Sequence, residues 1–162
     1  MPSINEVIER VGRVRPDAYD DKTKAGWLIE LDGKTYREVI LRHRLASGEG
    51  MHGPVGVCPE CGSTEIFYDE AMDCSSCQAC RWSELPDLVR AYPEDGDKPL
   101  LVGPPYDNLY DLYLMAQIDF YNREAENYNN SALAFNQAMD EFKKAYHRAH
   151  MPITRGSWTG LF

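Results

Sequence analysis

The chain has 162 residues, of which 43% are hydrophobic and 27% are charged, the composition of an ordinary globular protein of about one domain. No apolar run approaches the roughly 18 residues of a membrane span, and the start, MPSINEVIER, lacks the features of a secretory signal, so we expect no membrane segment and synthesis in a reducing compartment. Nearly all of the net charge of -9 lies between Ala46 and Pro99, where 11 acidic residues face three basic ones, which indicates a separate acidic module.

Two helices are predicted before this acidic segment. Ser3 and Glu6 match a capping box, so the first helix is expected from residue 3 to about residue 14, where Arg15-Pro16 ends it. Asp20 or Asp21 can cap the second helix, which is expected to run to about Arg42. The apolar stripes that support these helices are Ile4, Val7, Ile8 and Val11 in the first, and Trp27, Leu28, Leu31, Val39 and Ile40 in the second. We expect the second to be one continuous helix, with Asp32-Gly33 as its weak point.

The acidic segment contains all five cysteines, between Cys58 and Cys80, and Gly and Pro cluster on both sides of it. Cys58-Pro-Glu-Cys61 has the two-residue spacing with which two thiolates reach one tetrahedral zinc ion, and Gly62 lets backbone amides approach the sulfurs. In a reducing compartment, clustered cysteines favour a metal over disulfides. The sequence therefore predicts an inserted β zinc ribbon with one structural Zn2+ ion.

The second half of the metal site has two possibilities, because Cys74, Cys77 and Cys80 are each separated by two residues. In a zinc ribbon, the hairpin turn lies midway between the two inner ligands. With Cys61 and Cys77 as inner ligands the turn falls at the polar Asp69, whereas Cys74 as an inner ligand places two aromatic residues in the turn. Turn chemistry therefore favours the ligands Cys58, Cys61, Cys77 and Cys80, with Cys74 as a spare thiol; a Cys74/Cys77 pairing is the alternative. The strands are then expected at residues 65–68 and 72–76, with a third beginning at residues 81–83.

The predicted metal centre is expected to be structural, because four thiolates leave no coordination position for an activated water. Residues 57–85 hold six acidic residues and one arginine, and such a surface repels nucleic-acid phosphates. No acidic pair lies beside a recognisable nucleophile, and His147 and His150 suit the end of a helix dipole better than a metal; His43 and His52 stand alone. We predict that the protein is not an enzyme.

Two further helices follow the acidic segment. Pro104-Pro105 is expected to open the third, which ends near Asn122 and has its buried edge at Leu109, Leu112, Tyr113, Ala116 and Phe120. The fourth has apolar residues at alternating spacings of three and four, and Pro152 ends it. These seam residues are Ala125, Tyr128, Ala132, Phe135, Met139, Phe142, Tyr146 and Ala149. Such a heptad-like seam predicts near-antiparallel packing of the fourth helix on the third.

The predicted fold is therefore mainly α, a helical bundle with a long antiparallel helical hairpin and a small inserted β zinc ribbon. Residues 1–45 and 99–152 form the bundle, residues 46–98 the ribbon with its linkers, and residues 153–162 a C-terminal docking tail. The tail holds Trp158, Leu161 and Phe162 but is too short to make a core. These three residues are expected to contact this subunit or a neighbour.

Four phrases in the helical flanks carry a resemblance to a known family. They are Arg15-Pro16-Asp17-Ala18-Tyr19, Glu30-Leu31-Asp32-Gly33, Pro105-Tyr106-Asp107 and Tyr128-Asn129-Asn130-Ser131. With them, residues 4–42 and 99–152 resemble the head-tail connector proteins of long-tailed bacteriophages, also described as adaptor or head-completion proteins. The segment from about Ala46 to Lys98 departs from that family, whose members have a shorter connection and no ribbon.

The resemblance implies a structural protein of the virion neck, assembled in the host cytoplasm. Such a subunit forms a homo-oligomeric ring, commonly of twelve copies, that joins the portal and capsid to the tail and surrounds passing DNA without binding it specifically. The ribbon is expected to contact a neck, portal or tail protein, or to brace the adjacent subunit. A second interpretation, from a different class, is a zinc-ribbon nucleic-acid-binding or transcription-associated protein whose helices dimerise.

Overall fold

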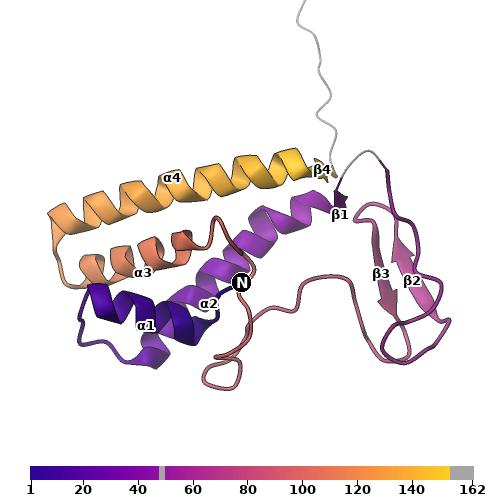
Figure 1. Ribbon diagram of the computed structural model, residues 1–162, viewed down its shortest axis with the longest axis horizontal. Helices are drawn as coiled ribbons and strands as arrows, with labels where there is room; N and C mark the ends of the chain where they lie inside the picture. Colours follow the sequence, from indigo (N-terminus) through magenta and orange to yellow (C-terminus); the bar gives the residue numbers. More distant parts are fainter. Residues whose placement is uncertain (48–49, 154–162) are drawn as a thin grey trace, which may run out of the picture. The chain divides into compact units, whose positions relative to one another are not determined.

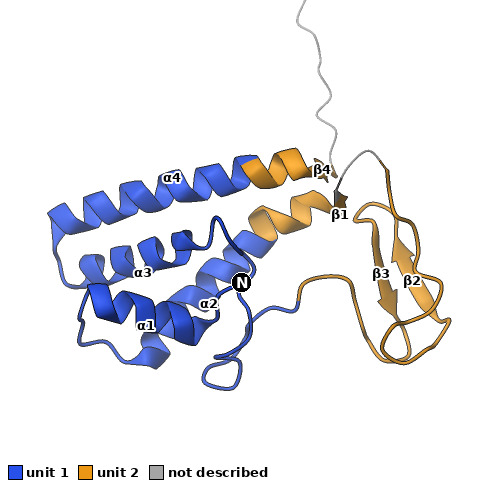
Figure 2. Cartoon of the chain, viewed as in Figure 1, with its two compact units in different colours: residues 1–36, 87–144 blue, residues 37–86, 145–162 orange. Residues whose placement is uncertain are grey.

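The structure is a computed structural model, and it describes residues 1–47 and 50–153. These residues form four α-helices, a short 3-10 helix and two sheets of two strands each, so the described chain is mainly helical (Figure 1). They belong to two compact units (Figure 2): unit 1 contains residues 1–36 and 87–144, and unit 2 contains residues 37–86 and the chain from Ala145. The domain boundaries expected from the sequence stay a prediction. None of the described helices is long and apolar enough to cross a membrane.

Helix α1 (Ile4–Val14) has the predicted capping box. The Glu6 amide donates to Ser3 Oγ at 3.3 Å, and the Ser3 amide donates to Glu6 Oε2 at 2.9 Å. The four predicted apolar residues of this helix are all buried. The helix ends at Val14 because proline at position 16 disfavours helical backbone at Arg15, which is extended.

Helix α2 (Asp21–Glu38) passes through Asp32-Gly33 without a break, as predicted, but it ends four residues earlier than expected. The 3-10 helix η1 (Ile40–Arg42) follows it. Aspartate weakens a helix when its carboxylate competes for nearby backbone amides. The buried Asp32 carboxylate is occupied elsewhere, because it accepts hydrogen bonds from the Tyr110 hydroxyl and from the Leu101 amide, so the helix continues.

Helix α3 (Asn108–Tyr121) begins after Pro104-Pro105 instead of at it, because residues 103–106 close a turn in which the Tyr106 amide donates to the Gly103 carbonyl. Its predicted buried edge is partly wrong. Leu109 and Ala116 are buried, but Phe120 is 56% exposed, and Leu112 and Tyr113 are half-buried. The face that packs in unit 1 instead carries Leu109, Tyr110, Leu114, Ile118 and Asp119. The choice of face follows from α1, which packs against α3.

Helix α4 (Ala125–Ala149) carries the predicted seam, but only Phe142 of its eight residues is buried. Ring contacts join this helix to α3: the ring centroids of Tyr113 and Phe135 are 5.2 Å apart, and those of Phe120 and Tyr128 are 5.4 Å apart. Helix α3 and the part of α4 that belongs to unit 1 lie side by side (Figure 1). Large aromatic side chains join them, and much of the seam is half-buried or exposed.

Polar contacts join segments of unit 1 that are far apart in the sequence. The fully buried Asp119 carboxylate forms an ion pair with Arg15 and accepts a 2.8 Å hydrogen bond from Ser131 Oγ. Arg10 on α1 pairs with Asp107 and Asp111 at the start of α3. These carboxylates therefore fix α1 and the beginning of α4 to α3.

Unit 2 contains both sheets. Strand β1 (His43–Ser47) pairs antiparallel with β4 (His150–Pro152), and β2 (Ile66–Asp69) pairs antiparallel with β3 (Cys74–Cys77). The first sheet was not predicted, because its strands are short and each adjoins a stretch whose sequence pattern is that of a helix or a linker. The second is the expected hairpin, displaced by one or two residues along each strand. Residues 81–83, expected to begin a third strand, do not form one; Ser83 makes an isolated bridge with Ser76.

Candidate metal centre

The thiols of Cys58, Cys61, Cys77 and Cys80 meet at one end of the β2–β3 hairpin, with all four Sγ atoms within 4.8 Å of one another. The Sγ atoms of Cys58 and Cys80 are 3.6 Å apart, as are those of Cys61 and Cys77. A tetrahedral centre with metal–sulfur bonds of about 2.3 Å has sulfur–sulfur edges of about 3.8 Å, whereas a disulfide bond measures about 2.05 Å. The observed separations therefore fit four thiolates around one metal ion.

The two knuckles that carry these thiols have the same backbone pattern. In the first, the Gly62 amide donates to the Cys58 carbonyl at 3.0 Å, and the Cys58 amide donates to the Ser63 carbonyl at 2.9 Å. In the second, the Arg81 amide donates to the Cys77 carbonyl at 3.0 Å, and the Cys77 amide donates to the Trp82 carbonyl at 2.8 Å. Both knuckles therefore turn their two sulfurs toward one point.

Each knuckle needs a left-handed residue directly after its second cysteine. Gly62 has φ +72° and Arg81 has φ +65°. Glycine adopts this conformation without the steric cost that a side chain adds. The sequence predicted that Gly62 lets backbone amides approach the sulfurs, but it did not predict the left-handed backbone of Gly62 or Arg81. The available signal for Arg81 was its position directly after Cys77-x-x-Cys80, which is equivalent to that of Gly62.

Backbone amides also donate hydrogen bonds to the sulfurs. Desolvation opposes ionisation of Cys58, but the amides of Cys61 and Glu60 and the thiols of Cys80 and Cys61 lower its pKa to about 7. For Cys80, the Trp82 amide favours ionisation, yet desolvation and the neighbouring cysteines raise the pKa to about 12. One thiolate forms readily and the next ones repel it, so a cation is required to hold all four in the ionised form.

Cys74 lies in the same hairpin but outside the four-cysteine cluster. It sits opposite Asp69 in the strand pairing, and it is three residues before Cys77. Side chains alternate along a strand, so Cys74 and Cys77 point to opposite faces of β3. Cys74 is 5% exposed, and burial raises the pKa of its thiol. The Cys74/Cys77 pairing is therefore not the arrangement in this structure.

A hydrogen-bond network around one buried carboxylate lies at the turn end of the β2–β3 hairpin. Asp73, which is fully buried, accepts hydrogen bonds from the His52 amide at 2.8 Å, the Gly53 amide at 3.2 Å and the Tyr68 hydroxyl. Desolvation opposes ionisation of Asp73, but these donors lower its pKa, and the same contact raises the pKa of Tyr68 to about 12. The sequence did not predict this network, because Asp73 follows no motif and its donors come from two separate segments.

The histidines have structural partners within unit 2. His43 Nδ1 lies 2.8 Å from the Val39 carbonyl, which can only accept, so Nδ1 carries a proton. His43 Nε2 lies 3.0 Å from His147 Nδ1, and His150 Nδ1 lies 3.2 Å from the Tyr146 carbonyl. Within residues 1–47 and 50–153, the four cysteines form the one group of three or more metal-ligating side chains. The predicted contact residues Trp158, Leu161 and Phe162 lie outside the described residues.

Comparison of the chain with protein-family models, with curated proteins and with solved structures gives no match.

Proposed function

We propose that this chain is a structural subunit of a ring in the neck of a long-tailed bacteriophage, with a zinc-bound hairpin that serves as a rigid protein-contact module. In this role the subunits join the portal and capsid to the tail and leave a passage for DNA. The chain acts by assembly and carries out no chemical step.

The observation that carries the proposal concerns the four phrases that resemble the head-tail connectors. Each contributes a polar residue to the contacts that hold unit 1 together. Arg15 and Ser131 meet on Asp119, Asp32 binds the Tyr110 hydroxyl, and Asp107 pairs with Arg10. The residues that resemble the connector family are thus residues that connect separate segments of unit 1. A chance resemblance would not favour such contact residues, so their positions support a helical scaffold shared with that family.

The cysteine centre supports a structural role for the metal. Four thiolates complete a tetrahedral shell, so no position remains for a bound water or substrate. Zinc fits this donor set best among common cellular ions, because it accepts tetrahedral sulfur coordination and has no redox chemistry of its own. Binding then orders the hairpin and presents its exposed surface, including Phe67, as a rigid module.

Native mass spectrometry of the purified full chain, alone and with the portal protein of the same phage, tests the proposal. The expected result is a discrete ring, commonly of twelve copies, with one zinc ion per subunit. A chain that stays monomeric in both samples would overturn the ring. Tight DNA binding at physiological salt that is lost in Cys58→Ser would overturn it in favour of the nucleic-acid-binding interpretation.

A further inference from the structure

Two histidines, His43 and His147, contact each other directly within unit 2. His43 begins strand β1, and His147 lies in the last turn of α4. His43 Nε2 and His147 Nδ1 are 3.0 Å apart, and the two ring centroids are 5.3 Å apart with an interplanar angle of 77°. His43 is 9% exposed, whereas His147 is exposed. The contact therefore joins a buried imidazole to one that solvent protons reach.

The proton positions of this pair follow from its neighbours. His43 Nδ1 carries a proton, because it lies 2.8 Å from the Val39 carbonyl. In a neutral His43 ring, Nε2 then has a lone pair and accepts from the Nδ1–H of His147. His147 can donate as a neutral ring or as a cation, since Nδ1 is protonated in both of these forms. The contact is therefore compatible with no charge or with one positive charge on the pair.

A second proton removes the acceptor between the two rings. It converts His43 Nε2 into a donor, so two N–H groups face each other with their nitrogens 3.0 Å apart. The two cationic rings then also repel each other, most strongly where burial reduces screening by water. The doubly protonated pair must therefore separate, whereas separated imidazoles accept both protons.

No carboxylate of the described residues forms an ion pair with either imidazole. Tyr146 of α4 places its ring edge-on to His43, with centroids 5.3 Å apart, and burial raises the pKa of Tyr146 to about 12, so its hydroxyl is neutral. The other ionisable groups on the surrounding elements within unit 2 are Arg37 and Glu38 of α2, Arg42 of η1, Arg44 of β1, Arg148 of α4, His150 of β4, and Cys74 and Cys77 of β3. The second positive charge on the pair therefore has no paired counter-charge.

We infer that His43 and His147 form a pH-sensitive clasp, which is closed while the pair carries at most one positive charge and opens when both rings are protonated. The clasp holds the last turn of α4 to the start of β1. The β1–β4 sheet begins at the same place, since His43 lies opposite Pro152. Opening in acid therefore loosens β4, which precedes the predicted contact residues of the C-terminal tail. The inference goes beyond the neck role, because it concerns the single chain.

The dependence on pH has a definite direction. Below about pH 6.5, the ordinary midpoint of histidine titration, the open state binds one more proton than the closed state. The equilibrium constant for opening therefore rises about tenfold for each further pH unit. The contact is strongest at neutral pH and is lost as the pH falls toward 5.

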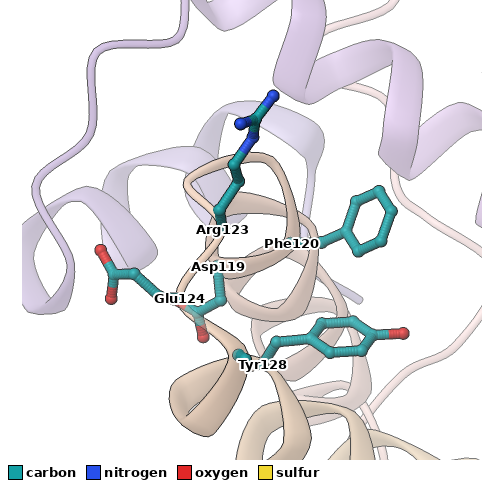
Figure 3. Close-up of a pocket in the computed structure, with 6 residues that line it drawn as sticks. Asp119, Phe120, Arg123, Glu124 and Tyr128 are labelled. Atoms are coloured by element: carbon teal, nitrogen blue, oxygen red, sulfur yellow. The ribbon is translucent and has the colours of Figure 1, made fainter.

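Hydrogen–deuterium exchange of the zinc-loaded full chain, read by mass spectrometry of its peptides, tests the clasp at pH 7.0 and 5.0. Protection factors correct for the intrinsic effect of pH on exchange. Peptides within residues 42–47 and 145–153 are expected to lose protection about tenfold or more. All four histidines lie in unit 2, so unit 1 is the internal reference. Its α3–α4 turn, where charged side chains but no histidine line a hollow, is expected to keep its protection (Figure 3).

Two variants identify the group that senses the proton. In His147→Asn the side chain does not titrate, and it can turn either its NH2 group or its carbonyl toward His43 Nε2. This variant is expected to lose protection less than about threefold between the two pH values, because one protonated ring is tolerated. His150→Gln is the matched control. His150 Nδ1 donates to the Tyr146 carbonyl at 3.2 Å in both the neutral and the cationic ring, so His150→Gln is expected to respond to acid like the wild type.

Constant protection in the wild type overturns the clasp, as does an equal loss in unit 1, which indicates general unfolding. A His150→Gln variant that no longer responds to acid also overturns it, because the sensor is then His150. Bound metal is measured in every sample, since His147→Asn and the wild type share the same cysteine centre. Loosening through loss of metal at pH 5.0 would affect both alike, so an equal response of the two proteins overturns the clasp.

Discussion

Cys74 and Cys77 show how a single residue position decides which thiol can reach a metal. Both lie in β3, but they point to opposite faces, so only Cys77 joins the cluster with Cys80. The polarity of the hairpin turn led to the same choice from the sequence. Arg81 illustrates the contrary case, since nothing in its own identity reveals the left-handed backbone that its position requires.

The spare thiol can be removed without loss of the metal. Cys74→Ser is expected to retain one bound metal ion per chain, because Cys74 lies outside the four-thiol cluster. Cys77→Ser, the matched change in the same strand, is expected to lose it, because three thiolates hold the ion far more weakly than four. Metal content after gel filtration measures both. Equal metal content in the two variants would contradict the assignment.

The Tyr68–Asp73 contact predicts a dependence of stability on alkaline pH. The hydrogen bond to Asp73, with desolvation and the Asp73 charge, raises the folded-state pKa of Tyr68 to about 12, above the unfolded value of about 10. A raised folded-state pKa gives stability that is complete below pH 10 or so and is lost as the pH rises toward 12. The difference in unfolding free energy between the wild type and Tyr68→Phe is therefore expected to shrink across this interval.

Urea unfolding at pH 8, 10 and 11.5 measures that difference in unfolding free energy. Both proteins contain the other tyrosines, so the contributions of these tyrosines to the pH dependence cancel in the difference. Tyr146→Phe is not a suitable control, because burial also raises the pKa of Tyr146 to about 12. Tyr19→Phe serves instead, since the Tyr19 hydroxyl donates to a neutral amide oxygen on Asn122. A difference for Tyr68→Phe that is constant over this pH range would refute the proposed coupling.

At the scale of whole elements, periodicity identified the four α-helices of the described residues but not which face each one buries. α1 buries the predicted face because a short amphipathic helix has one apolar stripe. α3 is apolar around most of its circumference, so the segments that pack against it determine which of its faces is buried. Leu114 and Ile118 are buried, whereas Phe120 is exposed. The seam of α4 marks an apolar stripe whose aromatic members Phe135 and Tyr128 contact Tyr113 and Phe120 of α3, yet most of the stripe is half-buried or exposed.

The capping box of α1 is expected to contribute measurably to stability. Ser3→Ala removes the acceptor of the Glu6 amide, and the loss of an N-terminal cap costs about 1 kcal/mol of unfolding free energy. Ser3→Asp keeps an acceptor at this position and is expected to retain most of the stability. Urea unfolding followed by circular dichroism measures both variants. A loss in Ser3→Asp as large as that in Ser3→Ala would show that the cap is not the cause.

At the scale of the molecule, the described chain returns to unit 1 after the cysteine hairpin. The Asn5 amide donates to the Gly96 carbonyl at 3.1 Å, and the Leu100 amide donates to the Pro2 carbonyl at 2.8 Å. Val89 is also buried in this unit. Unit 1 is therefore completed by residues that the sequence assigned to the linker after the ribbon.

Deletion of the cysteine hairpin is expected to leave the helical unit folded. Replacing residues 51–85 by a flexible Gly-Ser linker of about 15 residues keeps Val89 and Gly96, and a surface loop can be exchanged at a small entropic cost. Helical circular dichroism and cooperative unfolding are expected to persist, while bound metal is lost. A larger deletion of residues 51–95 is the matched comparison, and it is expected to be less stable because it removes Val89. Loss of helix in the smaller deletion would contradict the independence of unit 1.

The sequence by itself determined the features that depend on neighbours within a few residues: the capping box at Ser3, the four helical segments, the first cysteine knuckle, and the polar hairpin turn that favours Cys77-x-x-Cys80 as the second knuckle. Its periodicity and spacing encode these directly, since helix caps, knuckles and tight turns are local. The tertiary structure alone decided the buried face of α3, the β1–β4 sheet, the donors around Asp73 and the contact between His43 and His147. Each of these depends on which distant segment covers a side chain or supplies its hydrogen-bond partner, and burial has that effect only after the chain has folded.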